Sequence, residues 1–335
     1  MKKTQSPNNP HDKFYRATVG NPVYASDFLL NYADPVIAEN VDLEHLKIAP
    51  THQISEGLKE VIADVSFISR LRNEQETSEV LMFLEHKSKP SRFVPLQLAA
   101  QIILTLYSDH TASGYLETHD PPLPLAVLVY NGKEQLNDNM FFQDIFRYIP
   151  KRLIPLVMQF TIVVVNLQLY AYGHLPGNSA TQAIVESMKR ATDGTLLTHL
   201  SNVLIHVRDA NFGREQTLDL LKNITQYCNW VSKNHFTSHQ IHDSVEKVFS
   251  GQEGIEMATI IEKSLTQEGI EKGIEKGIEK GRLDSLLRIL TKRFCDVPTT
   301  LVEKLHRIKD LDRLARLVDT SLDCKSLDEF EQALK

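Results

Sequence analysis

Cysteine and long hydrophobic runs are both scarce in this chain. Its three cysteines, at positions 228, 295 and 324, lie far apart and form no CxxC pair, so neither a disulfide framework nor a cysteine zinc site is expected. The most apolar stretch, residues 153–172, is interrupted by one proline and three amide side chains and is too broken to span a bilayer. The N-terminal segment MKKTQSPNNPHDK has no apolar signal-peptide core. We therefore predict a cytoplasmic protein that does not cross a membrane.

An excess of positive charge is also missing. The chain has 37 Lys and Arg against 43 Asp and Glu, a net charge of -6, so the composition does not by itself indicate a nucleic-acid-binding protein. A phosphate backbone senses local charge, however, and a metal site itself adds carboxylates. Hydrophobic residues make up 42% and charged residues 24% of the 335 residues. These values are ordinary for a globular protein of one large domain with appendages, or of two domains.

The first half of the chain has the pattern of a mixed α/β domain. Residues 1–10 are polar without periodicity, and we expect them to be disordered. A short helical region follows, with Phe14 and the apolar triplet Phe28-Leu29-Leu30 as its anchors. Apolar runs then predict four strands with one helix between the second and third: strands 61–68, 80–87, 125–130 and 160–167, and helix 96–107. The first two strands, joined by a polar loop, predict an antiparallel hairpin, and the whole order indicates an α/β fold.

The predicted helix 96–107 has helically spaced apolar and polar residues. We expect its apolar face to be Leu96, Ala99, Ala100, Ile103 and Leu106, and its polar stripe to be Gln97, Gln101 and Thr105.

From residue 179 onward the pattern is helical. We predict a core domain at 11–178, a helical extension of it at 179–250, and a C-terminal region at 251–335 that holds a Gly-Ile-Glu-Lys repeat over 268–281 and further helices. Interior glycines weaken a helix, so the repeat indicates a hinge, a close helix–helix contact or low-complexity expansion. The leucines at 283, 286, 287 and 290 form an apolar face. We expect it to promote a homo-oligomer through the C-terminal helices, unless it folds back onto the core.

Three charged residues lie within or beside the first two predicted strands. Side chains alternate along a strand, so Glu85 and Lys87 share a face at the end of a strand that is apolar on both faces. Asp64 interrupts the apolar run of the preceding strand, and pairing of the two strands lets Asp64 approach Glu85. Buried charges are normally paired or bound to metal. A salt bridge from Lys87 to either carboxylate that closes the hairpin is the simpler interpretation.

A metal site is the other interpretation of these residues. Two adjacent carboxylates repel each other, and a divalent cation such as Mg²⁺ or Mn²⁺ relieves that repulsion. Lys87 could then orient or deprotonate a water, or stabilise charge on a phosphate. If Asp64 has no other partner, its removal should raise the melting temperature in the absence of the ion.

Several motifs occur in an order that resembles the family of recombination-promoting nucleases and YhgA-like transposases (Rpn, YhgA-like), within the PD-(D/E)xK nuclease superfamily. The motifs are His11-Asp-Lys-Phe14, Ser26-Asp-Phe-Leu-Leu30, Ile62-Ala-Asp-Val65, Phe83-Leu-Glu-His-Lys-Ser88, Tyr130-Asn-Gly132, 160–167 and the Gly-Ile-Glu-Lys repeat. The resemblance implies a restriction-endonuclease-like mixed-sheet core of αβββαβ type, followed by the all-helical region. It also implies Mg²⁺-dependent DNA endonuclease activity connected with recombination, with Asp64, Glu85 and Lys87 as the catalytic set.

The resemblance also suggests roles for further residues. The backbone carbonyl of His86 would join Asp64 and Glu85 as a metal ligand. His11 and Asp12 open the family's first helix and are accessory candidates, although Asp12 could simply cap that helix with His11 in solvent. Gln101 is a third accessory candidate, at a helix position where many members carry arginine.

The chain departs from the family at two further points, with Lys87 where members often have glutamine and Asn166 where they often have an acidic residue.

DNA is the partner that this interpretation implies. Lys89 and Arg92 follow the Glu85 strand and could bind phosphates, or they could lie on a solvated surface. Arg147, Lys151 and Arg152 are basic residues farther on. Two alternatives to a nuclease stay open: a catalytically inactive nuclease-fold module that binds DNA or protein, and a structural helical assembly module.

Overall fold

The computed structural model of the chain describes residues 9–49, 64–72, 78–113, 120–136, 139–232, 238–294, 297–306, 308 and 310–334. They fall into two compact units, the first ending at Glu262 and the second beginning at Lys263. We predicted that residues 1–10 are disordered. Residues 1–8 lie outside the described residues, and Pro10 begins a helix. No helix among the described residues is long and apolar enough to cross a membrane.

The first unit is built on a six-stranded mixed sheet with the order β1-β2-β3-β4-β6-β5. The strands are β1 Lys47–Ile48, β2 Val65–Arg70, β3 Glu79–Lys87, β4 Leu123–Tyr130, β5 Asn139–Phe141 and β6 Thr161–Asn166. β2 and β3 form the predicted antiparallel hairpin, whereas β3, β4 and β6 run parallel. The predicted α/β fold with a mixed sheet is therefore confirmed. The short strands β1 and β5 at its edges were not predicted.

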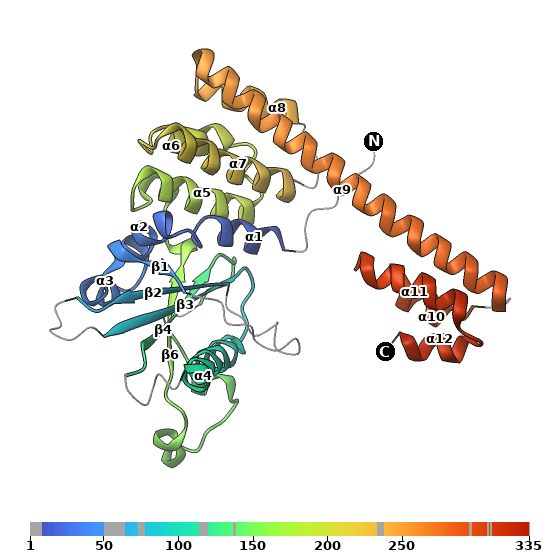
Figure 1. The fold of residues 1–335 in the computed structure, drawn as a ribbon. Helices are drawn as coiled ribbons and strands as arrows, with labels where there is room; N and C mark the ends of the chain where they lie inside the picture. The colour runs from blue at the N-terminus through green and yellow to red at the C-terminus, as the bar shows by residue number, and fades with distance from the viewer. Residues whose placement is uncertain are drawn as a thin grey trace. The chain divides into compact units, whose positions relative to one another are not determined.

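Helices surround this sheet and continue through the rest of the chain (Figure 1). Those of the first unit are α1 Pro10–Ala17, α2 Pro22–Tyr32, α3 Pro35–Asn40, α4 Val94–Ser113, α5 Ser179–Asp193, α6 Leu200–Arg208, α7 Arg214–Val231, α8 Ser238–Val248 and the start of α9 Gly251–Phe294. Short 3-10 segments are η1 Leu43–His45, η4 Phe142–Ile145, η5 Lys151–Leu156, η6 Leu167–Leu169 and η7 Tyr172–His174. Each of α1, α2 and α3 begins with proline, whose fixed φ suits the first helical position. On α2, the predicted anchors Phe28 and Leu29 are buried, but Leu30 is 53% exposed.

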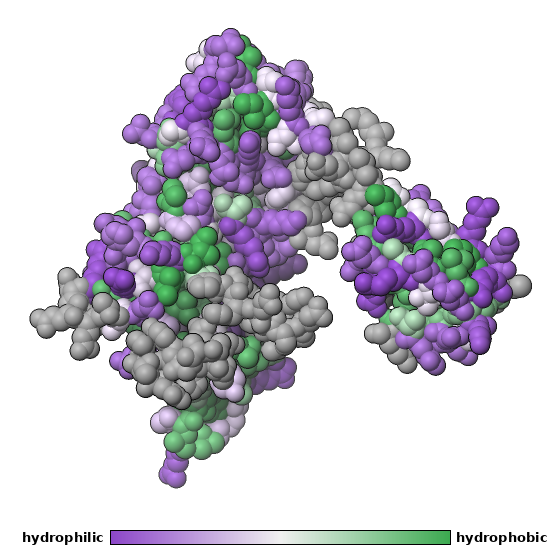
Figure 2. Space-filling view, in the orientation of Figure 1, coloured by the Kyte–Doolittle hydropathy of each residue, from purple (hydrophilic) through white to green (hydrophobic). Residues whose placement is uncertain are grey.

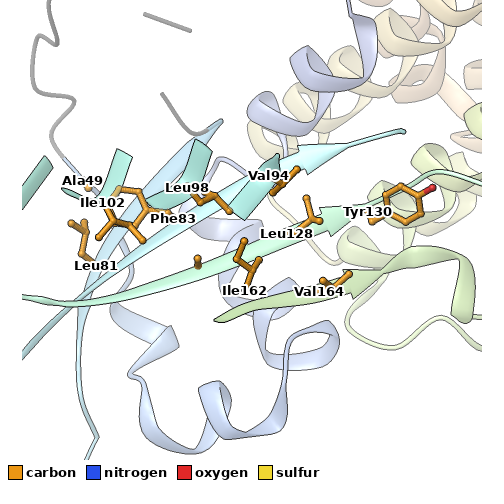
Figure 3. Packing of buried hydrophobic residues seen from close by; sticks show 11 residues of the cluster. Ala49, Leu81, Phe83, Val94, Leu98, Ile102, Leu128, Tyr130, Ile162 and Val164 are labelled. Carbon is orange, nitrogen blue, oxygen red and sulfur yellow. The ribbon is translucent and has the colours of Figure 1, made fainter. Parts of the chain in front are cut away.

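Helix α4 packs on one face of the sheet and forms a hydrophobic core with it (Figure 3). The residues that α4 buries there are Val94, Leu98 and Ile102, at four-residue spacing. The apolar face predicted for this helix is only partly right: Ala99 is buried and Leu106 packs against the core, but Leu96 and Ile103 are 46% and 54% exposed. The sequence of α4 is apolar around most of its circumference, so periodicity alone could not select the buried face. The actual face brings the predicted polar residues Gln97 and Gln101 toward the sheet side.

The second unit contains the C-terminal part of α9 together with α10 Thr299–His306, α11 Leu311–Asp323 and α12 Leu327–Ala333. Leu283, Leu286 and Leu290 of α9 are buried in a cluster with leucines of α10 and α11 and with Phe330 of α12. Neighbouring helices of the same unit thus cover the leucine face that we expected to promote a homo-oligomer. The helix α9 runs without a break through the repeat at 268–281.

Candidate active site

The end of β3 is the place where the predicted catalytic residues meet. β3 lies between β2 and β4, and seven of its nine residues are buried. Glu85 is only 2% exposed. The pleat places Glu85 and Lys87 on the face that α4 covers, whereas His86 points to the opposite face and stacks on Tyr15 of α1. The sequence therefore predicted the faces of these three residues correctly.

Asp64 lies beside Glu85, as expected, but immediately before β2 and not in the middle of a strand. Its side chain is 7% exposed. The Oδ2 atom of Asp64 accepts a hydrogen bond of 2.8 Å from the backbone N–H of His86. The backbone N–H of Asp64 donates to Glu85 Oε2 at 3.3 Å. These two hydrogen bonds join the start of β2 to the end of β3, so both carboxylates are held at the same end of the hairpin.

Each of the two carboxylates also has a cationic partner. Lys87 Nζ lies 2.5 Å from Glu85 Oε1, and Gln97 of α4 donates to the same oxygen at 2.8 Å. The Arg16 guanidinium of α1 donates to Asp64 Oδ1 at 2.7 and 3.1 Å. Sequence reasoning missed Arg16 and gave Gln97 no part in the site. The salt bridge that was the simpler sequence interpretation is thus present between Glu85 and Lys87.

Burial and mutual repulsion shape the charge of the site. Burial, followed by the negative charge of Asp64, raises the pKa of Glu85, and the contacts from Lys87 and Gln97 oppose that rise only in part. The pKa of the buried Tyr15 phenol is also raised, first by burial and then by the charges of Asp64 and Glu85. Burial is thus the main cause of both shifts, and the neighbouring carboxylates add to it.

Helix α1 reaches the site through Asp12. The Oδ1 atom of Asp12 lies 2.8 Å from Nδ1 of the His86 imidazole. The backbone N–H of the same residue, His86, donates to Asp64. The expectation that Asp12 caps the helix is wrong, because Asn9 occupies the N-cap position. Among the described residues, His86 Nε2 and the Tyr15 hydroxyl are buried without a hydrogen-bond partner. Asp12 thus contacts the candidate site through the His86 side chain.

His11 contacts a different helix. Its Nδ1 lies 2.6 Å from the Tyr227 hydroxyl of α7, and Tyr227 stacks on Phe14 of α1 at 4.1 Å between ring centroids. Burial, and then the neighbouring His86, lowers the pKa of His11. The expectation of a solvated His11 is wrong, because the ring joins α1 to α7.

The remaining candidates differ in burial. Gln101 is 3% exposed, and within the described part of the chain its Oε1 has no hydrogen-bond partner. Lys89 and Arg92 are exposed, with the Arg92 guanidinium 4.8 Å from the centroid of the Phe93 ring. Asn166 is buried and accepts a hydrogen bond from the Gln168 backbone at the start of η6.

A group of exposed basic and apolar side chains lies on residues 146–158, around η5. Arg147, Lys151 and Arg152 are exposed there, next to large apolar side chains that include Tyr148 and Leu156, each 80% exposed. Green hydrophobic surface is visible at the lower end of the molecule in Figure 2, where Figure 1 draws this segment. A surface of this kind can bind a phosphate backbone or a protein partner.

The donor set at the end of β3 suits a hard cation. Two carboxylates converge there, and within the described residues the buried Gln101 carbonyl oxygen, one turn beyond Gln97 on α4, has no hydrogen-bond partner. Oxygen ligands of this kind are those that Mg²⁺ prefers in proteins, so the residues present fit such an ion. A bound ion would share these carboxylates with Arg16 and Lys87, which donate to Asp64 Oδ1 and Glu85 Oε1.

Comparisons with known proteins were consistent with this geometry. Residues 9–217, about three fifths of the chain, match the family described as "Putative transposase, YhgA-like". Recombination-promoting nuclease RpnA of Escherichia coli (strain K12) is 26% identical over 134 residues, which are 40% of this chain and 44% of that protein. The similarity thus spans less than half of the curated relative. No solved structure matches the chain.

Proposed function

The chain belongs to the family of YhgA-like transposases, and from that membership we propose that it is a DNA endonuclease that depends on Mg²⁺ or Mn²⁺ and acts in recombination or on mobile elements. The observation that carries the proposal is the convergence of Asp64 and Glu85, nearly buried, at the end of β3 with Lys87 beside them. Arg16 and Lys87 partner these carboxylates in the structure, and two nearly buried carboxylates that lie this close together also form a set of oxygen ligands for a divalent cation.

Each residue has a distinct part in this proposal. Asp64 and Glu85 would hold the cation, with the His86 backbone carbonyl as a further ligand. A bound Mg²⁺ would supply Lewis-acid stabilisation of the phosphate and a water of lowered pKa. Lys87 is half-buried and close enough to Glu85 to be held in place, where its ammonium would stabilise negative charge that develops on the phosphate.

DNA would be held by exposed cations near this site. Lys89 and Arg92 follow β3 directly and extend into solvent, so they would bind phosphates on either side of the cleaved bond. Such contacts are sensitive to ionic strength because phosphate binding releases counterions. We therefore expect DNA binding to weaken steeply with salt, and Lys89→Ala together with Arg92→Ala to reduce that dependence.

Cleavage of supercoiled plasmid DNA tests the proposal. The full-length protein should cut in Mg²⁺ or Mn²⁺ and not in EDTA, and Asp64→Asn and Glu85→Gln should abolish cutting. Asp209→Asn is a matched control, because Asp209 is an exposed carboxylate with an arginine partner at 2.8 Å and should cut like the wild type. Cutting that survives in Asp64→Asn and Glu85→Gln would refute the assigned site.

A catalytically inactive nuclease-fold module is the second candidate function. One observation favours it: within the described residues, the carboxylate oxygens of Asp64 and Glu85 already accept hydrogen bonds from Arg16, His86, Lys87 and Gln97. A charge cluster that is satisfied internally needs no ion. Salt-sensitive DNA binding in gel-shift assays, with no cleavage in any divalent cation, would support this alternative.

Self-association through the C-terminal helices remains a proposal with a narrower basis. The leucine face of α9 is covered by α10–α12. An interface between two copies of the chain would therefore use the repeat at 268–281, where glycine, which has no side chain, allows two helices to approach closely. Light scattering at micromolar concentrations tests it, and a full-length monomer would refute it.

A further inference from the structure

Helix α8, Ser238–Val248, carries a cluster of potential metal ligands that is separate from the candidate active site. His239, His242 and Asp243 follow the spacing i, i+3 and i+4, which places them on one face of the helix. One ligand atom from each residue lies within 4.8 Å of the others. The opposite face, formed by Ile241, Val245 and Val248, is buried. The helix thus presents an apolar face to the protein and a ligand-rich face outward.

The distances within the cluster are too long for hydrogen bonds. Asp243 Oδ1 lies 3.8 Å from His239 Nδ1 and 3.7 Å from His242 Nδ1, and Glu246 Oε2 lies 3.9 Å from His242 Nδ1. Two ligands of a tetrahedral zinc ion are separated by about 3.3 Å, given metal–ligand bonds of roughly 2.0–2.1 Å. The observed separations need only small side-chain rotations to reach that value.

One atom of the cluster provides an independent indication of a ligand. His242 Nδ1 is buried, and within the described part of the chain it has no hydrogen-bond partner, although the side chain as a whole is 18% exposed. A buried polar atom without a partner costs free energy. The rings of His239 and His242 stack with centroids 6.0 Å apart and an interplanar angle of 26°. A metal ion between the imidazoles and the carboxylate would satisfy His242 Nδ1.

From this arrangement we propose that α8 binds a Zn²⁺ ion through His239, His242 and Asp243. Two imidazole nitrogens with carboxylate oxygens select borderline transition metals, in contrast to the all-oxygen set at Asp64 and Glu85, which suits Mg²⁺. Three protein ligands would leave the fourth position of a tetrahedral zinc ion to water.

The bound ion would stabilise a short helix. α8 has only 11 residues, a length that is marginal for a helix in water without tertiary support. The ligands at 239, 242 and 243 come from successive turns of the helix, so a bound ion would link those turns on the exposed face. Because metal binding to a folded site stabilises that fold, Zn²⁺ should raise the melting temperature of the protein.

Isothermal titration of the full-length protein with Zn²⁺ tests the site. The wild type should bind the ion with an affinity at least about tenfold higher than that of His242→Ala or of His239→Ala, and Zn²⁺ should raise the melting temperature of the wild type alone. His45→Ala is the matched control, because His45 is an exposed histidine 2.8 Å from the carboxylate of Asp42, and it should bind like the wild type. Co²⁺ should give visible absorption bands that disappear in His242→Ala.

The active-site variant Asp64→Asn separates this site from the nuclease proposal. Zn²⁺ affinity that is kept in Asp64→Asn but lost in His242→Ala supports the α8 site, whether or not the protein cleaves DNA. Equal Zn²⁺ affinity, stoichiometry and melting-temperature shift in the wild type, His239→Ala and His242→Ala would overturn it. Binding that is lost only in Asp64→Asn would also overturn it, because the ion would then occupy the end of β3.

Discussion

Substitution of Asp64 by alanine and by asparagine should have different effects on stability and the same effect on activity. From the sequence, Asp64 is a lone carboxylate in an apolar segment, whose removal should stabilise the metal-free protein. In the structure it accepts hydrogen bonds from the His86 backbone and from Arg16. Alanine removes both acceptor oxygens, whereas asparagine keeps one neutral oxygen that can accept from the His86 N–H.

The magnitude follows from these two contacts. His86 is 1% exposed, so the loss of its acceptor leaves a buried N–H unsatisfied, which costs about 1–3 kcal/mol. The ion pair with Arg16, which is 53% exposed, adds about 0–1 kcal/mol. Relief of the repulsion with Glu85 offsets part of this loss. We expect Asp64→Ala to lower the free energy of unfolding by about 1–3 kcal/mol, and Asp64→Asn to change it by less than about 1 kcal/mol.

Thermal unfolding followed by circular dichroism in EDTA, together with plasmid cleavage in Mg²⁺, measures both effects. For a unit of this size, the expected loss in Asp64→Ala lowers the melting temperature by roughly 2–10 °C. Neither variant should cleave DNA, because neither carries the charge that holds the cation. An Asp64→Ala protein as stable as the wild type would refute the assigned role of the His86 hydrogen bond.

Four further outcomes are expected. Glu85→Gln should stabilise the metal-free protein at neutral pH. Because the pKa of Glu85 is raised in the folded protein, the contribution of Glu85 to the free energy of unfolding is fully present in acid and is lost as the pH rises above 4.5, the ordinary pKa of glutamate. Urea denaturation of both proteins from pH 4 to 8 in EDTA should show the difference grow with pH, and a difference that shrinks would contradict the reasoning. Lys87→Gln should keep measurable plasmid cleavage, as expected from the family's use of glutamine, while Glu85→Ala keeps none; an inactive Lys87→Gln would make the charge obligatory. Asp12→Ala should lower both stability, by about 1 kcal/mol, and cleavage, whereas Asp12→Asn retains an acceptor for His86 and should lose less of each; equal effects would remove Asp12 from its positioning role. A fragment ending at Glu262 should fold with a cooperative melt, because the contacts of the two units are largely internal, and a fragment without such a melt would show that the first unit needs the second.

The sequence alone determined much of the end of β3. A run of apolar residues with no polar interruption predicted a strand buried on both faces, and the two-residue period of a strand then placed Glu85 and Lys87 together and His86 opposite. The polar loop between the first two strands was enough to predict the hairpin and the approach of Asp64 to Glu85. These features follow from local rules, because pleat and hairpin geometry act over a few residues.

Tertiary structure decided the partners of those residues. Arg16 meets Asp64 across 48 positions of the sequence, Asp12 meets His86 across 74, and no local pattern specifies either pair. The buried face of α4, and with it the contact from Gln97 to Glu85, was likewise undetermined while the helix was apolar on most sides. Periodicity indicates which side chains of one helix or strand share a face. Which neighbour each face meets depends on how all the elements pack to bury apolar surface and satisfy buried polar groups, and that is settled only in the complete fold.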